Sequence, residues 1–581
     1  MSFNRYYYDE LSYLRDLGEV FARENPALAP FLTRQSTDPD VERLLEAFAF
    51  LTGRLREKLD DDLPELSHSL LSLIWPHYLR PVPSMTVVQF TPRMVGAAPS
   101  VVEPGVYLES RPIDGTRARF RTCYRTQVSP LRVAAVRLQS TPTAASLTLD
   151  LELMAGAAFA TMTQDSLRFY LDTERDRLLG RTLYLYLNRF LDDVLVSSAD
   201  GQELHLSAEA LKPVGFGEDE AVIPQPKTGF SGYRLLQEYF LMPQKFMFVD
   251  LEGLQQIRQF TGSKLSIQFM FTRAFELNAR VDASHFRLNA TPAVNLFPFE
   301  GEPIKIHHTR TEYQVNPGGM RPDSFEIYAV DQVTGRRQGE RKPVEYLPFD
   351  GYRHDMGDGE SKPSYRLRRR ANAPGQRSEI SISFVRPRGD SAPLSETVSF
   401  QLTCSNAPLM DRLGAGMLDQ PTETSPTQLT FSNLGPATAP VAPPLAGDLT
   451  WQLIANLSNN YASALDVTLM RRLLATYNFR AFYDRQAERQ LNLMMSGLLG
   501  IDSQRLDWLL GGLPIRGHEI RVRMSEARFG GEAEMFLFAA VLERYLGRYA
   551  NVNACYRLVA IGSDNNVEYA WPVRIGSRPA L

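Results

Sequence analysis

The chain has 581 residues, of which 44% are hydrophobic and 22% are charged, and these values are ordinary for a folded globular protein. Its formal net charge of −4 is small for this length, so the composition does not favour a nucleic-acid-binding function. No apolar run approaches the roughly 18 residues that a membrane-spanning helix needs, and no signal peptide is recognisable. These features predict a cytoplasmic protein that does not enter the membrane, built from about three domains.

Residues 1–80 carry two amphipathic helical patterns. The first covers residues 5–24, where apolar side chains recur at steps of three and four: Tyr7, Leu11, Leu14, Leu17 and Phe21. The second covers residues 39–60. There Asp38 can cap the helix, Pro39 suits its first position, and one apolar face follows: Val41, Leu44, Leu45, Phe48, Leu51, Leu55 and Leu59. A third short helix is expected over residues 64–74. Such helices bury too little area to stand alone, so they must pack on the chain's own body or on another protein.

From Met85 onward the hydrophobic period changes from helical to two, which is typical of strands. The alternation is clear over residues 147–153, 265–269, 380–384 and 398–402, where one set of side chains suits a core and the other suits water. Proline and glycine separate these runs. Residues 81–406 are therefore expected to form a large, mostly antiparallel β region, in one or two lobes.

Residues 407–448 are rich in Pro, Thr, Ala and Gly, which predicts an extended linker or wrapping segment. Beyond it, Asp448 and Asp466 can each cap a helix, and a further helical stretch runs towards Leu499. A strand over residues 520–524, a helix over 532–549 and a strand over 556–561 complete a compact α+β domain over residues 449–581. The predicted fold class is therefore a multidomain α+β protein with an N-terminal helical bundle segment.

Residues that would carry catalytic or metal chemistry do not form a recognisable pattern. The sequence contains no P-loop, no GxSxG elbow and no HExxH motif. His307 and His308 would point to opposite faces of a strand, so they cannot easily hold one metal ion. We therefore expect no catalytic, cofactor-binding or metal site. A β-rich hydrolase that uses dispersed carboxylates, or a ligand-binding β module, stays open as the alternative function.

The segment over residues 232–251 is dense in aromatic residues and includes Arg234, and aromatic residues with arginine are expected of contact surfaces. It resembles the central signature of the TssF family, the baseplate wedge subunits of the bacterial type VI secretion system. The signature positions in this segment are Tyr233, Arg234, Glu238, Tyr239, Phe240, Pro243 and Lys245. Further family blocks follow in the same order along the chain, and their signature positions are Asn295, Phe297, Trp451, Trp571, Arg574 and Arg578.

Matches around Tyr6 and Tyr7, and around Asp38 and Pro39, extend this resemblance over nearly the whole chain. The chain departs from the family pattern at Ala290, where cysteine is often found, and at Ala293, where a larger β-branched residue is usual. Neither departure touches a proposed reaction.

The resemblance implies a cytoplasmic structural protein that is not an enzyme. Two copies would join one TssG-like subunit in a wedge, and six wedges would surround the spike hub and support assembly and contraction of the tail sheath and tube. The resemblance also implies contacts with a docking, TssK-like subunit and with a sheath-initiating, TssE-like subunit. The baseplate would dock at the inner membrane through other subunits, with no nucleic acid as a partner. On this basis we expect the apolar faces of the two N-terminal helices to bind wedge partners.

Overall fold

The fold is given by a computed structural model. It describes residues 7–8, 10–14, 17, 39–60, 68–72, 75–93, 100–224, 231–277, 279–306, 310–319, 321–337, 342–349, 363–371, 378–385, 396–445, 466–510, 513–548 and 555–576. By compactness the chain divides into a small unit, Met1–Leu73 with Pro444–Ser458, and a large unit, Ile74–Pro443 with Asn459–Leu581. The domain boundaries expected at residues 80, 406 and 448 stay predictions. Within the described ranges, no helix is both long and apolar enough to cross a membrane.

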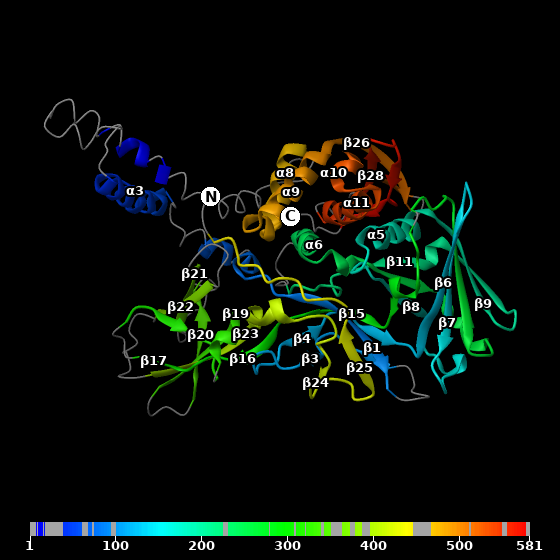
Figure 1. The fold of residues 1–581 in the computed structure, drawn as a ribbon, viewed down its shortest axis with the longest axis horizontal. Helices are drawn as coiled ribbons and strands as arrows, with labels where there is room; N and C mark the ends of the chain where they lie inside the picture. Colours follow the sequence, from blue (N-terminus) through cyan, green and yellow to red (C-terminus); the bar gives the residue numbers. More distant parts are fainter. Residues whose placement is uncertain are drawn as a thin grey trace. The chain divides into compact units, whose positions relative to one another are not determined.

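The described residues of Met1–Leu73 in the small unit are helical. Helix α3 (Pro39–Asp60) has the extent that the sequence predicts (Figure 1). In the first predicted helix, residues 7–8, 10–14 and 17 are helical, and in the third predicted helix, residues 68–72 are helical. Phe21 and Asp38 lie outside the described residues.

A six-stranded sheet holds the first core of the large unit, and its strands come from distant parts of the sequence. Its order is β24 (Gln420–Pro421), β3 (Tyr107–Glu109), β4 (Arg119–Thr122), β15 (Ala290–Val294), β1 (Met85–Pro92) and β25 (Leu429–Asn433). In β1, Met85 pairs with Val294 of β15, and Val88 pairs with Asn433 of β25. A two-stranded sheet of β2 (Ser100–Val102) and β5 (Thr126–Val128) accompanies it.

Two further sheets follow the period-two pattern of the sequence. The five-stranded sheet has the order β10 (Glu203–Ser207), β9 (Leu191–Ser198), β13 (Lys264–Phe271), β7 (Ala145–Leu153) and β6 (Leu131–Ser140). The four-stranded sheet has the order β11 (Leu211–Val214), β12 (Phe248–Glu252), β8 (Ser166–Leu171) and β14 (Phe286–Leu288). In β7 buried and half-buried side chains alternate along the strand, which confirms the predicted strand over residues 147–153.

An eight-stranded sheet surrounds a separate hydrophobic core that includes Val333, Ile382 and Phe400. Its main path is β16 (Phe297–Glu300), β23 (Glu396–Ser405), β19 (Glu326–Arg337), β20 (Val344–Pro348), β21 (Ser364–Ala371), β22 (Ser378–Val385) and β18 (Tyr313–Val315), with β17 (Ile304–Ile306) paired to β23. Strands β22 and β23 confirm the two alternating runs predicted there.

The last part of the chain combines helices with a five-stranded sheet. The helices are α8 (Val467–Tyr477), α9 (Arg485–Gly497), α10 (Glu526–Phe529) and α11 (Glu532–Gly547). The strands are β26 (Leu498–Leu510), β27 (Leu513–Met524), β28 (Cys555–Gly562), β29 (Glu568–Ala570) and β30 (Arg574–Ile575). Asp466 caps α8 as predicted, because its carboxylate accepts hydrogen bonds from the backbone N–H groups of Thr468 and Leu469, both at 2.8 Å. The elements predicted from Asp466 onward are present, whereas β26 was not predicted. The helix expected after Asp448 lies outside the described residues.

Two helices that the sequence did not reveal lie within the predicted β region. They are α5 (Arg177–Leu185), continued by a π-helical turn η3 (Tyr186–Phe190), and α6 (Ser231–Leu241), followed by the 3₁₀ turn η5 (Pro243–Phe246). Both α5 and α6 pack against α11, and α6 also packs against α8 (Figure 1). The middle region and the C-terminal segment therefore share one helical layer. The chain as a whole mixes helices with mostly antiparallel sheets, as predicted.

The segment expected as a linker or wrapping segment wraps over the six-stranded sheet where it is described. It forms the 3₁₀ helix η10 (Ala407–Arg412), and its strands β24 and β25 form the two edges of that sheet. Leu409, Leu418 and Phe431 are buried in the same core as Phe90 and Phe120. Up to residue 443 this segment is thus part of the folded large unit, which matches a wrapping segment better than a free linker.

Candidate partner-binding surfaces

Helix α3 exposes a stripe of large apolar side chains. Leu44, Phe48 and Leu51 are 68%, 61% and 59% exposed, and their spacing places them on one face of the helix. Leu45 is half-buried and Ala49 is fully buried, so this helix packs through a neighbouring face. The exposed stripe of Leu44, Phe48 and Leu51 is called the α3 stripe below.

The remaining predicted partner-binding residues of the two helices differ in exposure. Leu11 is buried, and Tyr7 and Leu14 are half-buried. Leu17 is exposed, as is its neighbour on the same face, Tyr13. The side chains of Phe21, Val41 and Leu55 lie outside the described set. A role in partner binding stays a prediction for all of these residues.

The central signature segment is buried inside the chain, so the expectation that it forms a contact surface is wrong. Tyr233 on α6 stacks on Tyr477 of α8, with ring centroids 4.9 Å apart, and meets Trp75 edge-on at 4.3 Å. Tyr239 donates a hydrogen bond to Glu534 of α11 at 2.8 Å. Phe240 and Pro243 are half-buried. These aromatic contacts join the middle region to the C-terminal helices, and this explains their presence without any external partner.

Glu238 forms the centre of a buried ion cluster. One of its carboxylate oxygens accepts hydrogen bonds from the backbone N–H groups of Val222 and Ile223 at 2.8 and 2.9 Å. The other accepts from Lys245 Nζ at 2.5 Å and lies 3.7 Å from Nε of Arg234. Glu238 and Lys245 are both fully buried, and burial lowers the pKa of Lys245 while Glu238 acts in the opposite direction. The cluster pins the chain that precedes α6 to the turn that follows it.

The loop of Gly215, Phe216 and Gly217 binds a carboxylate of its own chain. The N–H groups of Gly215 and Gly217 both donate to Oε2 of Glu220, at 2.7 and 2.8 Å. Gly215 has a φ of +103°, and a Cβ there would lie 2.5 Å from the carbonyl oxygen of Lys245. The two amides are therefore already occupied, which argues against a phosphate site.

The other described signature positions also have internal contacts. Asn295 accepts a hydrogen bond from the backbone N–H of Asn406 at 2.6 Å, and so links the end of β15 to the end of β23. Phe297 is buried in the core of the eight-stranded sheet. Trp571 stacks on Phe536 of α11 at 5.5 Å, and Arg574 donates to the buried Glu543 at 2.6 Å. Trp451 and Arg578 lie outside the described residues.

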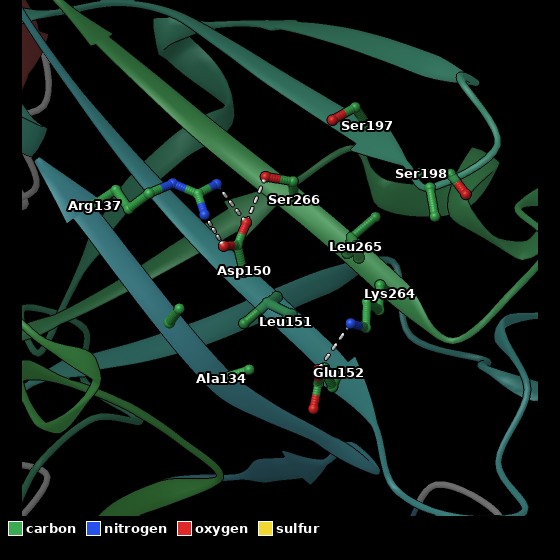
Figure 2. A pocket seen from close by; sticks show the side chains of 12 residues that line it. Ala134, Arg137, Asp150, Leu151, Glu152, Ser197, Ser198, Lys264, Leu265 and Ser266 are labelled. Carbon is green, nitrogen blue, oxygen red and sulfur yellow. Dashed lines mark hydrogen bonds and ion pairs between the residues drawn. The ribbon is translucent and has the colours of Figure 1, made fainter. Parts of the chain in front are cut away.

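A pocket over strands β6, β7, β13 and β9 gathers charged side chains (Figure 2). Asp150 forms an ion pair with Arg137 at 2.6 Å and accepts a hydrogen bond from Ser266 at 3.0 Å. Glu152 lies 3.5 Å from Lys264 and 2.6 Å from Arg132. Both carboxylates are thus paired with arginine or lysine side chains of their own sheet, and neither is free to act on a bound substrate. The pocket therefore gives no support to the alternative of a hydrolase.

Histidine and cysteine side chains form no ligand set in the part of the chain that the structure describes. No group of three or more His, Cys, Asp or Glu side chains there could hold a metal ion. Cys123, Cys404 and Cys555 are buried free thiols. His77 is buried in the large unit, and His307 and His308 lie outside the described residues.

The C-terminal hairpin of β26 and β27 forms a surface that was not predicted from the sequence. Leu506 and Leu509 on β26 are 39% and 76% exposed, and all side chains from Asp502 to Asp507 are exposed. Gly511 and Gly512, followed by Pro514, gave a turn signal that could have revealed a hairpin.

Comparison with known proteins gives consistent matches over the chain. The family model described as "Type VI secretion system, TssF" matches residues 1–578. "Type VI secretion system component TssF1" of Pseudomonas aeruginosa is 31% identical, with 99% of each chain covered. Among solved structures, a chain of the type VI secretion system TssK-TssF-TssG baseplate subcomplex has a TM-score of 0.76 at 29% identity, covering 93% of this chain and 99% of that one. A chain of the baseplate complex from the type VI secretion system has a TM-score of 0.65 at 26% identity, with 100% of each covered.

Proposed function

This chain belongs to the TssF family of type VI secretion system baseplate components, and we propose that it is a structural subunit of the wedge that binds its partners through the α3 stripe. The observation that carries the proposal is the exposure of Leu44, Phe48 and Leu51 in the chain by itself. Three large apolar side chains at helical spacing suit an apolar groove or the core of a helical bundle in a complex. Burying them completely would contribute on the order of 4 kcal/mol.

The solved relatives support specific partners. One similar structure is a complex of TssK, TssF and TssG, so a TssG-like subunit and a TssK-like subunit are the partners proposed for this chain. A second copy of the chain in each wedge, a TssE-like subunit and the spike hub are further partners implied by family membership alone. We also propose that the chain works in the cytoplasm, in a baseplate that docks at the inner membrane through other subunits.

A structural role without catalysis is the second part of the proposal. The described carboxylates at the pocket of Figure 2 are paired with arginine and lysine. Glu238 accepts hydrogen bonds from three groups of its own chain and lies beside the guanidinium of Arg234. The family is one of baseplate components, which also favours a structural role. A hydrolase would instead predict turnover by the isolated protein that is lost on changing a single carboxylate.

The test is co-purification of the full chain with a TssG-like subunit and a TssK-like subunit. Phe48→Asp places a charge in the middle of the α3 stripe, and we expect at least a tenfold loss of complex. Arg43→Asp is the matched control, because it adds the same side chain to an exposed position of the same helix outside the stripe. Its exposed ion pair with Asp40, at 3.8 Å, contributes little. Equal complex yields from the two variants would contradict the proposal.

A further inference from the structure

Strand β26 leaves one side of its backbone without a strand partner among the described residues. In the C-terminal sheet β27 flanks it on one side, and β26 is the edge strand on the other. Arg471 of α8 covers the start of that edge, since its guanidinium donates to the carbonyl oxygen of Leu498 at 2.6 and 3.2 Å. Further along, from Asp502 to Asp507, every side chain is exposed on both faces of the strand. An uncovered strand edge of this kind is a template for a strand from another chain.

The end of the hairpin extends beyond the rest of the sheet. Among the residues that the structure describes, β28 pairs with β27 only from Gly517 onward, and no described strand lies beside the part of the hairpin formed by residues 513–516 and their partners in β26. A two-stranded hairpin alone is marginally stable in water. This one also exposes Leu506 and Leu509 and half-buries Trp508. Its length and its apolar side chains favour a partner that covers it.

We propose that the free edge of β26 pairs in antiparallel register with β26 of a second copy of this chain, about a two-fold axis at Leu506. In an antiparallel pair, side chains directly opposite each other point to the same face. A two-fold axis therefore has to pass through a residue that faces its own equivalent. With Leu506 on the axis, Arg505 lies opposite Asp507 of the second copy, and Asp507 lies opposite Arg505 of the second copy.

Charge complementarity selects this register over its neighbours. An axis at Arg505 would place two arginines opposite each other, and an axis at Asp507 would place two aspartates opposite each other. An axis at Gln504 would place Asp502 opposite Leu506. Like charges directly opposite each other destabilise a strand pair, whereas opposite charges and apolar pairs stabilise it. Only the axis at Leu506 gives two attractive charge pairs together with an apolar pair.

The two faces of the paired strands then have distinct characters. Leu506 and Trp508 point to one face, because side chains two residues apart share a face. There the two Leu506 side chains would meet, each with Trp508 of the other copy at the diagonal position. The charge pairs of Arg505 and Asp507 lie on the opposite face. The strand thus offers an apolar contact and an ionic contact to the same partner.

This contact deepens the proposed function, because it assigns a surface to the second copy of the chain. It rests on the proposed function only for the presence of two copies in one assembly. Self-association tests the β26 contact, whereas co-purification with wedge partners tests the α3 stripe. A Phe48→Asp chain that loses its wedge partners should still pair through β26, and a chain whose β26 pairing fails should still bind those partners.

The test exchanges charges between copies. Arg505→Asp and Asp507→Arg each turn both charge pairs into repulsive ones, and we expect roughly tenfold or greater loss of self-association for each in sedimentation velocity of the full chain. An equimolar mixture of the two variants should associate again, because every pair across the axis then joins opposite charges. Misfolding of either variant would not be reversed by mixing. Arg489→Asp, an exposed position on α9, is the control and should self-associate normally.

A second measurement does not depend on the charges. Leu506→Cys places a thiol on the axis, and the native cysteines are no more than 7% exposed. A short bismaleimide should link two Leu506→Cys chains, and should not link two Arg489→Cys chains, both alone and in the complex with partners. No link at position 506, or no recovery on mixing the two charge variants, would overturn the proposal.

Discussion

Replacing Glu238 by glutamine should strongly destabilise the large unit. The substitution keeps the shape of the side chain and one acceptor for the N–H groups of Val222 and Ile223, which bond Glu238 at 2.8 and 2.9 Å. It removes the charge that faces Lys245 Nζ at 2.5 Å in a fully buried site. Breaking a buried pair by removing one partner costs about 3–5 kcal/mol, since the other charge is left uncompensated.

The double variant Glu238→Gln/Lys245→Met separates this cause from a general defect in packing. The double variant removes the buried ammonium group, the cation nearest to the carboxylate, and leaves only the more distant guanidinium of Arg234, so about 2 kcal/mol of the loss should be recovered. The assay is urea unfolding followed by circular dichroism, with the midpoints of the wild type and of the single and double variants compared at one pH. A Glu238→Gln midpoint equal to that of the wild type, or a double variant less stable than Glu238→Gln alone, would refute this reasoning.

Three further changes test other parts of the fold. Burial, with a smaller contribution from Arg80, lowers the pKa of His77 from 6.5 to about 4, so the folded state binds fewer protons than the unfolded state. The free energy of unfolding should therefore fall as the pH drops from 6.5 towards 4, by up to about 3 kcal/mol. In urea titrations at each pH, His77→Gln should remove this part of the pH dependence. Asp466→Ala should cost about 1 kcal/mol by uncapping α8, measured as a lower urea midpoint, and an unchanged midpoint would mean that the cap is dispensable. Gly215→Ala should lower the thermal midpoint far more than Gly416→Ala, because both have positive φ but only Gly215 has a backbone atom within 4 Å of the added Cβ; equal shifts would argue against the clash.

The strands with one buried face could be predicted from the sequence, whereas elements buried or exposed on all sides could not. Strand β7 alternates strictly, so its period is visible. Helix α6 buries Tyr233, Leu236 and Glu238 alike and therefore shows no polar face at helical spacing. Strand β26 could not be predicted for the opposite reason: over residues 502–507 both of its faces are exposed, so apolar and polar residues do not alternate along it.

The candidate partner-binding surfaces could likewise be predicted only in part from the sequence. The apolar spacing of α3 predicted a helix with a face that needs covering, and Leu44, Phe48 and Leu51 are exposed. The sequence could not tell that Leu45 would pack within the chain, since it belongs to the same apolar pattern. The buried cluster of Glu238 and Lys245 depends on backbone groups some 15 residues away in the sequence, and no local spacing reports such a contact.

The strand order of the six-stranded sheet also determines when β1 can pair with its neighbours during synthesis of the chain. Strand β1 is complete at Pro92, yet its two neighbours β15 and β25 end at Val294 and Asn433. At a translation rate of about 5–20 residues per second, β1 waits roughly 20–70 s for its last neighbour to leave the ribosome. During that interval Val88 and Phe90, buried once folding is complete, are exposed to the crowded cell. Chaperones that bind nascent chains should therefore engage this polypeptide early and release it only late in synthesis.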